Sequence, residues 1–408
     1  MPETENKAPM ISVDEALQII RKTARLTPAE EVAIADAAGR TVAEAVLARI
    51  THLPYRASAM DGYAVRHVDA SKAGARLSVV GEAAAGAPFA RPIEAGEAVR
   101  IFTGGVVPDG ADHVVIQEEV ERSGDKIVVT AEQDEPGNIR PPGADFHEGD
   151  ELVRPGDLLT PIKASWIASA NVAKISAHKR PRVFYFANGD ELAAPGADLK
   201  LGQVISSTPA GFGPLIASFG AEAAFGGVAS DSVESVRAMI DKALEWDADL
   251  ITPLGGASVG DYDLVKPAFR ESGFDFLFEK IAVKPGKPTW FAQTDKTLAL
   301  GLPGNPASTF ACAILFVRPL LRAMLGDSKP RARRMPAKLS TPLPKNGPRE
   351  HYLRALYATD REGAVRAEAF SNQDSSLLTP FVNANCLIRR APNAPAAEPD
   401  DLVEILPL

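Results

Sequence analysis

The chain has 408 residues, of which 45% are hydrophobic and 24% are charged, and its formal net charge is −9. This length suits about two to four domains, and the acidic balance argues against non-specific binding to nucleic acid or to an acidic membrane surface. No apolar run reaches the ~20 residues of a membrane span, and the first residues lack the basic and apolar segments of a secretory signal. Because Cys312 and Cys386 are the only cysteines, we expect no disulfide framework and a cytoplasmic location.

The first part of the chain predicts helices. Ser12 and Glu15 form a capping-box pattern before an apolar run, and Thr27-Pro28 is expected to begin a second helix within residues 12–47. Thr160-Pro161 is expected to begin a further helix that packs near the first ones. Residues 1–48 and 142–178 are therefore predicted to form one discontinuous helical region.

Residues 49–141 predict an inserted β lobe, because short apolar runs such as LSVVGEA and KIVVT alternate there with glycine and proline turns. Three turns of the lobe and its border carry polar side chains: Asp61 in SAMDGYA, Thr103 in FTGG and Asp145 in RPPGAD. None of these turns is specific for one chemistry by itself.

Residues 179–327 alternate between strand-like runs (VFYFA, DLITP, TLALG) and helical segments. Parallel strands need such crossover connections, so this part predicts an α/β domain with a mostly parallel sheet. In such sheets ligands bind beyond the carboxyl ends of the strands. Short β-like runs in residues 328–408 predict a C-terminal β domain.

Three loops of the α/β domain favour an anionic ligand. In GGASVGD, glycine lets backbone amides approach an anion; in KPGKP, two lysines lie on a loop stiffened by proline; LPGNP opens a helix, whose N-terminus attracts anions. Taken singly, each loop equally fits a tight turn, a solvated charged turn or a helix cap. The loop residues predicted to bind are Gly255, Gly256, Ser258, Lys284, Lys287, Pro303, Gly304 and Asn305.

Carboxylates also begin or end several predicted elements of this domain. Glu191 follows the strand VFYFA, and Asp231 and Asp263 lie at the starts of later elements. Mg²⁺ prefers carboxylate and phosphate oxygens, so these positions suit a magnesium site. Asp231 equally fits a plain helix N-cap.

Taken in order, seven segments resemble the MoeA family of molybdopterin molybdenumtransferases, which is related to the E domain of gephyrin. The resemblance implies a multidomain α/β and β fold: a MogA/MoaB-like α/β domain with a parallel sheet, a helical region, an inserted β lobe and a C-terminal β domain. The segments are SAMDGYAV, RIFTGGVVPDGADHVV, IRPPGAD, NGDEL, GGASVGDYD, IAVKPGKP and GLPGNPAS, which span residues 58 to 308.

The resemblance also implies an activity. Adenylylated molybdopterin and molybdate would give molybdenum cofactor and AMP with the help of Mg²⁺, in a homodimer whose cleft lies between the α/β domain of one subunit and the β lobe of the other. It allows contacts with other proteins of cofactor biosynthesis and gives no reason to expect nucleic-acid or membrane partners. The implied catalytic residues are Asp61, Thr103, Asp145, Asp231, Lys284 and Lys287; the implied metal ligands are Glu191 and Asp263; Gly255, Gly256, Ser258, Pro303, Gly304 and Asn305 would hold phosphate or pterin.

The chain departs from the family pattern at six cleft positions, which removes hydrogen-bonding groups on the nucleotide and pterin side. Two alternatives therefore stand beside the transferase. One is a molybdopterin adenylyltransferase, which shares the α/β domain but lacks the added lobes; the other is a non-catalytic cofactor-binding or scaffold paralogue, which the substitutions favour. The six positions are Ala57, Ala187, Asn188, Ser206, Thr208 and Leu254.

Overall fold

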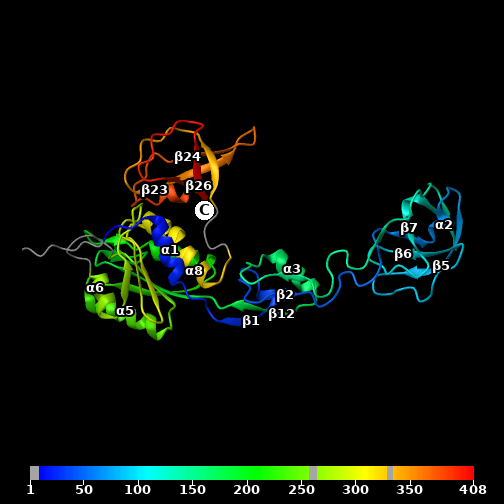
Figure 1. Ribbon diagram of the computed structural model, residues 1–408, viewed down its shortest axis with the longest axis horizontal. Coiled ribbons are helices and arrows are strands. Elements are labelled where there is room, and N and C mark those ends of the chain that lie inside the picture. Colours follow the sequence, from blue (N-terminus) through cyan, green and yellow to red (C-terminus); the bar gives the residue numbers. More distant parts are fainter. Residues whose placement is uncertain (1–8, 257–263, 329–333) are drawn as a thin grey trace, which may run out of the picture.

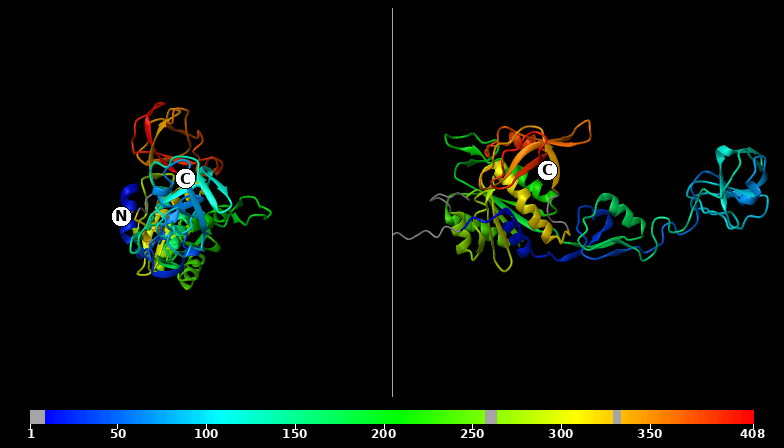
Figure 2. Two further views of the ribbon diagram at one scale, coloured as in Figure 1. Left: turned by 90° about the vertical axis from the view of Figure 1, so that its right-hand side faces the viewer. Right: turned by 45° about the horizontal axis from the view of Figure 1, so that its top comes forward.

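The computed structural model describes residues 9–256, 264–328 and 334–408. The molecule is elongated (Figures 1 and 2): the α/β domain and the C-terminal β domain lie together at one end, the β lobe lies at the other, and a narrow middle region joins them. The multidomain α/β and β architecture expected from the sequence is confirmed. Where the domain boundaries fall remains our proposal.

The α/β domain contains a six-stranded sheet in the order β16-β13-β17-β21-β20-β18. The pairings among the first four strands are parallel, and β20 pairs antiparallel with both β21 and β18, so the sheet is mostly parallel as predicted. The strands are β13 (Arg182–Asn188), β16 (Glu222–Ala229), β17 (Leu250–Leu254), β18 (Asp275–Phe278), β20 (Trp290–Gln293) and β21 (Leu298–Gly301).

Helices cover both faces of this sheet. One buried apolar cluster contains side chains of α1, α4 and the helix that begins at Pro306, and a second contains side chains of α5 and α6. The helices are α1 (Val13–Thr23), α4 (Thr208–Ser218), α5 (Val233–Glu245), α6 (Val265–Glu271), α7 (Pro306–Cys312), the π-helical η3 (Ala313–Val317) and α8 (Arg318–Met324).

The continuous helix from Pro306 to Met324 is, among the described residues, the one segment long and apolar enough to cross a membrane. Its most apolar window is 72% buried inside the protein, as is usual for the core helix of a globular domain. The α1 helix begins at the predicted capping box, in which Ser12 Oγ accepts from the Glu15 amide and Glu15 Oε2 accepts from the Ser12 amide.

The predicted second N-terminal helix is wrong. The chain forms strand β1 (Ala29–Ala33), which pairs antiparallel with β12 (Lys174–His178), and then a single 3-10 turn, η1 (Ile34–Asp36). Only Val32 is buried in β1, so the segment has no apolar helical face, and pairing with β12 determines its conformation. Farther on, β2 (Val46–Leu47) pairs with β11 (Glu151–Val153).

The predicted helix after Thr160 is confirmed as α3 (Pro161–Ser169), and the Thr160 side chain caps it. Its expected neighbour is wrong, however: α3 contacts η1 in the middle region, whereas α1 packs against α8 of the α/β domain. The helical region expected for residues 1–48 and 142–178 is therefore a mixed α and β middle region without α1.

The β lobe is a six-stranded sheet in the order β7-β4-β6-β5-β9-β8. Two neighbouring chain segments enter and leave it, as in an inserted domain (Figure 1), and β3 (Ala57–Ser58) pairs with β10 (Ile139–Arg140) at its base. The remaining elements are β4 (Gly62–Val65), α2 (His67–Ala70), β5 (Arg76–Ala83), β6 (Glu97–Ile101), β7 (His113–Ile116), η2 (Gln117–Glu119), β8 (Val120–Ser123) and β9 (Lys126–Val129).

The C-terminal domain is a second six-stranded sheet, in the order β19-β23-β24-β22-β26-β25, with an additional pairing between β23 and β25. Its strand β19 (Val283–Lys284) comes from the segment that links β18 to β20, so backbone hydrogen bonding joins the two domains. The other elements are β22 (Met335–Leu339), β23 (Glu350–Thr359), β24 (Val365–Ala369), α9 (Thr379–Val382), β25 (Cys386–Arg390) and β26 (Leu402–Pro407).

Candidate active site

The carboxyl ends of β13, β17 and β21 meet at a cavity of about 720 Å³, which we call the strand-end cavity. Glu191 lines it after β13, Gly256 after β17, and Pro303, Gly304 and Asn305 after β21. The structure thus brings together residues that are far apart in the chain. Ser258 and Asp263 lie outside the described residues.

Two positions after β17 require glycine. Gly255 has φ 105°, and a Cβ there would lie 2.9 Å from the Asn188 carbonyl oxygen. Gly256 has φ 67°, and a Cβ there would lie 2.1 Å from Val265 Cγ2. Because L-residues rarely adopt such φ values, both glycines are needed for the chain to turn at the cavity wall.

Asn188 is a candidate ligand-binding residue that sequence reasoning treated only as a departure from the family. It is 8% exposed and lines the cavity, and its Oδ1 is buried without a hydrogen-bond partner among the described residues. Its Nδ2 donates to Asp231 Oδ1 at 2.8 Å. Since a buried polar atom without a partner costs free energy, Oδ1 is suited to accept from a ligand.

Asp231 is not the helix N-cap that one interpretation of the sequence expected. The α5 N-cap is Ser232, whose Oγ accepts from the Ser235 amide at 3.1 Å. The Asp231 carboxylate instead accepts from Asn188 and from the Asp190 amide, and Asp190 Oδ1 accepts from the Asp231 amide at 3.2 Å. This reciprocal contact holds an exposed carboxylate beside the end of β13.

Glu191 is also exposed at this edge. A Cβ on Gly189 would lie 2.4 Å from Glu191 Oε2, so the carboxylate folds back toward the end of β13. Among the described residues, no three His, Cys, Asp or Glu side chains form a group that could hold a metal ion. Mg²⁺ commonly uses one or two carboxylates together with substrate phosphates, and Glu191 and Asp231 fit that smaller requirement.

The C-terminal domain supplies one wall of the strand-end cavity, which the sequence did not indicate. Ser376, Leu377 and Leu378 line it. Asn305 Nδ2 donates to Ser375 Oγ at 3.0 Å and so ties the start of α7 to this wall. The sequence feature that could have indicated this wall is the hydroxyl-rich run SNQDSS. The run by itself does not show that it packs against the α/β domain.

The two lysines of the KPGKP loop lie beside different cavities. Pro288, next to the exposed Lys287, lines the strand-end cavity. Lys284 instead lines a cavity of about 840 Å³ in the C-terminal domain, which we call the basic cavity; its other charged or titratable lining residues are Lys345, His351, Glu368 and Arg390. Gly286 separates the lysines, and a Cβ there would lie 2.3 Å from the buried Cys312 Sγ.

Five of the six departures from the family pattern share one location. They line the strand-end cavity, whereas Ala57 is buried in β3 at the base of the lobe. The substitutions therefore change the wall of this cavity itself. The five residues are Ala187, Asn188, Ser206, Thr208 and Leu254.

The β lobe brings Asp61 and Thr103 together. Asp61 Oδ1 accepts from the Thr103 amide at 2.7 Å and from Thr103 Oγ1 at 2.8 Å. These hydrogen bonds, opposed by slight desolvation and aided by the charge of Arg100, lower the pKa of Asp61, so its carboxylate is ionised at neutral pH.

Arg100 anchors this part of the lobe. Its guanidinium lies 5.1 Å from the ring centroid of Tyr63 and 4.9 Å from that of Phe102, and it donates to the Gly62 carbonyl and to Gln117 Oε1. Stacking against two rings limits the motion of the cation. Asp61 thus has a fixed positive neighbour.

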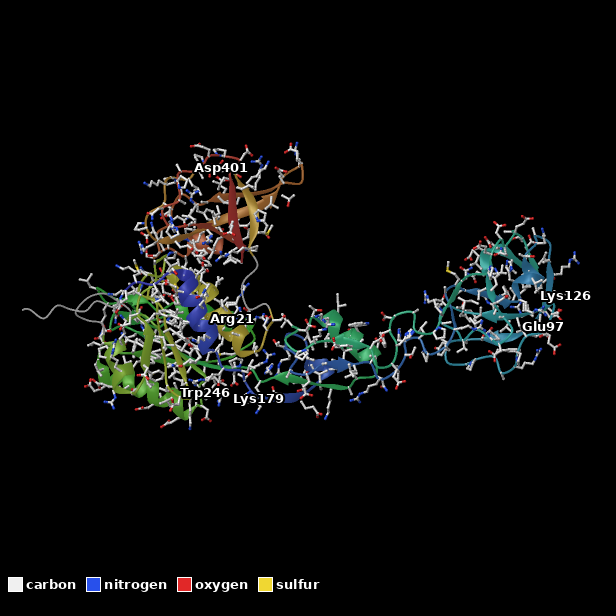
Figure 3. All side chains as sticks on the ribbon, in the orientation of Figure 1. Arg21, Glu97, Lys126, Lys179, Trp246 and Asp401 are labelled. Carbon is white, nitrogen blue, oxygen red and sulfur yellow. The ribbon has the colours of Figure 1, made fainter. Side chains whose placement is uncertain are left out.

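Within one subunit the lobe does not reach the strand-end cavity. Figure 3 labels Glu97 and Lys126 in the lobe, Trp246 at the end of α5 and Asp401 in the C-terminal domain, and the whole middle region separates the lobe from the other two. Asp145 lies where the middle region meets the lobe, with its Oδ2 3.8 Å from His52 Nδ1. The lobe residues and the residues of the strand-end cavity thus form two separate groups in one chain, and Lys284 belongs to neither.

Comparison with known proteins matches the regions that contain these two groups to regions named for MoeA or for molybdopterin binding. The MoeA N-terminal region (domain I and II) matches residues 11–171, a probable molybdopterin binding domain matches residues 185–323, and the MoeA C-terminal region (domain IV) matches residues 336–408.

Whole-chain relatives agree with these matches. A molybdopterin molybdenumtransferase of Haemophilus influenzae is 32% identical over 93% of this chain and 94% of its own, and one of Bacillus subtilis is 30% identical over 94% and 90%. A crystal structure of the molybdopterin biosynthesis MoeA protein from Pyrococcus horikoshii OT3 covers 98% of this chain and 100% of its own, with a TM-score of 0.82 and 25% identity. The chain therefore belongs to the MoeA family of molybdopterin molybdenumtransferases.

Proposed function

We propose that this protein is a molybdopterin molybdenumtransferase, which inserts molybdenum from molybdate into adenylylated molybdopterin and releases AMP. The observation that carries the proposal is the convergence of three glycine- or proline-shaped loops on the strand-end cavity, in a chain that belongs to this family. A cavity of about 720 Å³ falls within the usual ~300–1,000 Å³ of small-molecule sites.

The phosphate groups of the substrate would lie against the β17 and β21 loops. Gly255 and Gly256 allow close approach of the backbone, and Pro303, Gly304 and Asn305 place the N-terminus of a long helix at the cavity. Lys287, exposed beside this wall, would offset negative charge that develops on phosphate or molybdate oxygens.

Glu191 and Asp263 are the proposed Mg²⁺ ligands, together with substrate phosphates. The fixed carboxylate of Asp231 at the same strand end supports a cation there. When bound, the ion would supply positive charge against the pyrophosphate. The protein's own contribution is to orient these carboxylates and the loop amides around the phosphates.

We further propose a homodimer in which Asp61, Thr103 and Asp145 act on the strand-end cavity of the partner subunit. Two observations support it. The lobe lies far from the α/β domain of its own subunit (Figure 1), whose strand ends form the strand-end cavity, and an apolar groove of about 800 Å³ on α4, α7, η3 and α9 offers a surface to bury. Leu215, Phe310, Ile314 and Phe381 line that groove.

We also propose a cytoplasmic location and contacts with other proteins. A cytoplasmic location is supported by Cys312 and Cys386, which are both buried and unpaired. Contacts with other proteins of cofactor biosynthesis are expected from family membership.

The decisive test is an assay with purified protein, adenylylated molybdopterin, molybdate and Mg²⁺ that follows AMP and active cofactor. We expect both products to form together. Tight pterin binding without turnover would instead identify a non-catalytic paralogue, and product formation from molybdopterin and ATP would identify an adenylyltransferase.

A further inference from the structure

The chain leaves the β lobe through residues 130–138, which lie between β9 and β10 and which we call the return segment. Throughout this described segment the backbone forms neither helix nor strand. The Asn138 carbonyl oxygen accepts from the Ala59 amide at 2.8 Å, and β10 pairs with β3 directly after it. Because Ala59 lies two residues before Asp61, the return segment supports the turn that carries this proposed catalytic carboxylate.

Two histidines hold the return segment in place. His113 of β7 is 2% exposed; its Nδ1 accepts from the Gly137 amide at 2.8 Å, and its Nε2 lies 3.0 Å from Gln133 Oε1. His67 of α2 places its Nε2 2.8 Å from the Gln133 carbonyl oxygen. The two imidazole rings meet edge to face, with centroids 5.5 Å apart. The segment is thus tied to the lobe at both Gln133 and Gly137.

The hydrogen-bond partners of His113 require a neutral ring. Since the Gly137 N–H donates to Nδ1, that nitrogen carries no proton, and Nε2 carries the ring proton and donates to Gln133 Oε1. The Gln133 amide is oriented to match, because its Nε2 donates to Glu119 Oε2 at 2.8 Å. A proton added to Nδ1 would face the Gly137 N–H and break this hydrogen bond. The Gly137 carbonyl oxygen is farther from Nδ1, at 3.2 Å, and already accepts from the Val114 amide, so it does not replace the lost contact.

The surroundings of His113 also favour the neutral ring. Burial lowers the pKa of His113 below its ordinary value, and the charge of His67 adds to this effect, whereas three neighbours oppose it. The opposing neighbours are Gln133, Gly137 and Asp112. Glu119 of η2 reaches the ring only through Gln133. The contacts of the neutral ring are therefore complete above the ordinary histidine pKa of ~6.5 and are lost as pH falls through the lower folded-state value.

We propose that His113 is a positioning residue: its neutral ring clamps the return segment against the Asp61 turn, and protonation of the ring releases the segment. Gly137, which His113 holds, is followed directly by Asn138, which holds Ala59. Loss of the first contact therefore loosens the support of the turn. The clamp itself does not depend on the activity of the protein, and only its effect on turnover rests on the proposed function.

Amide hydrogen exchange of the full-length protein tests the clamp without substrate. Protection in a peptide that covers the return segment, corrected for the intrinsic effect of pH on exchange, should fall about tenfold from about pH 7.5 to about pH 5.5. A peptide that covers β6 of the same lobe should keep its protection over this range. Unchanged protection of the return segment would overturn the proposal.

Substitutions separate protonation from loss of the side chain. His113→Asn keeps an acceptor near the place of Nδ1 but cannot be protonated, so its return segment should be equally protected at both pH values. His113→Leu has no acceptor and should be weakly protected at both; if it does not fold, His113→Asn decides alone. His147→Asn, at an exposed histidine outside the lobe, should respond to pH like the wild type. A pH response that persists in His113→Asn would reject the clamp.

Turnover then tests the link to Asp61. At about pH 5.5, kcat for AMP release should be about twofold lower in the wild type than in His113→Asn, with KM for adenylylated molybdopterin equal in both and with equal kcat at about pH 7.5. Equal kcat at both pH values would show that the clamp does not position Asp61. Absence of turnover at every pH would count against the proposed function instead, and the exchange experiment would still decide the clamp.

Discussion

Asp61 is the residue for which the lobe provides the most specific surroundings, with two hydrogen bonds from Thr103 and the stacked Arg100 close by. We expect Asp61→Asn to lower kcat by about 10²-fold, because the amide keeps the shape but loses the negative charge. Steady-state AMP release measures the effect. The variant should remain folded, because Asp61 lies at a partly exposed turn and the asparagine oxygen can still accept from Thr103.

The matched control is Asp125→Asn, at the exposed turn between β8 and β9 of the same lobe. It should turn over like the wild type. Equal activity of all three proteins would remove Asp61 from the catalytic residues.

The Glu350 side chain links two strands of the C-terminal sheet, β23 and β25. It is 6% exposed and accepts from Tyr352 Oη at 2.6 Å and from two Arg389 nitrogens at 2.9 Å. Burial raises the pKa of Glu350, but the hydrogen bonds from Arg389 and Tyr352 outweigh burial and lower it below its ordinary value. We expect Glu350→Gln to lower the free energy of unfolding by about 2 kcal/mol at pH 7.

The pH dependence follows from that lowered pKa. The stabilisation is complete above the unfolded-state pKa of ~4.3 and is lost as pH falls through the folded-state value. Denaturation curves of wild type and Glu350→Gln should therefore converge below about pH 4. Glu404→Gln, at the exposed partner of the same arginine, should cost less than ~1 kcal/mol; a gap that stays constant with pH would contradict this account of Glu350.

Single residues of the strand-end cavity could be predicted only where the residues next to them in the sequence determine the shape of the loop. The glycines and Asn305 lie in loops whose shape depends on nearby residues, and the structure places Gly256 and Asn305 on the cavity. Ser376 and Leu378 come from a different domain, and their position depends on how that domain packs. Lys284 shows the same limit, because pairing with β23 directs it to the basic cavity.

At the level of elements, α1 shows that local sequence can predict where a helix begins without predicting which element the helix packs against. Its capping box is local and was predicted, whereas its contact with α8 joins segments about three hundred residues apart. Ile20 is fully buried in the core shared with the α/β domain. We expect Ile20→Ala to cost about 3 kcal/mol through lost burial and a residual cavity.

In a background where Trp166 and Trp246 are replaced by phenylalanine, chemical denaturation followed by the fluorescence of Trp290, which is buried in the sheet, should report this loss. Lys22→Ala, on the exposed face of the same helix, should change stability by less than ~0.5 kcal/mol. An unchanged Trp290 transition in Ile20→Ala would mean that α1 does not stabilise the α/β domain.

Strands β13, β17 and β21 of the α/β sheet were predictable because each is a buried apolar run bounded by glycine, proline or a helix start. The helix prediction for residues 29–33 was wrong because this segment is not a buried apolar run. A proline at a plausible first helical turn suggested a helix, but β12 supplies the hydrogen bonds that make the segment a strand. Long-range pairing overrides local preference most easily where only one side chain is buried.

The elongated shape of the whole molecule separates the two groups of predicted site residues (Figure 1). Local sequence patterns carried no information about this separation, because it depends on the extended middle region that lies between the α/β domain and the β lobe. We therefore propose that a cleft that needs both groups is formed between subunits. This consequence can be tested without knowing the dimer structure.

Subunits that carry Asp61→Ala and subunits that carry Lys287→Ala should each be inactive alone, whereas co-expression of the two should restore activity. With random pairing, half of the dimers are mixed and each holds one intact cleft, so about a quarter of wild-type activity is expected per subunit. A matched mixture of two lobe variants, Asp61→Ala and Thr103→Ala, should restore none, because every cleft then receives a defective lobe. Separately tagged subunits allow the mixed dimer to be purified and assayed for AMP release. If the mixed dimer were inactive although both parent proteins fold and pair, the lobe would not act on its partner's cavity, and the cleft would have to close within one subunit by movement of the middle region.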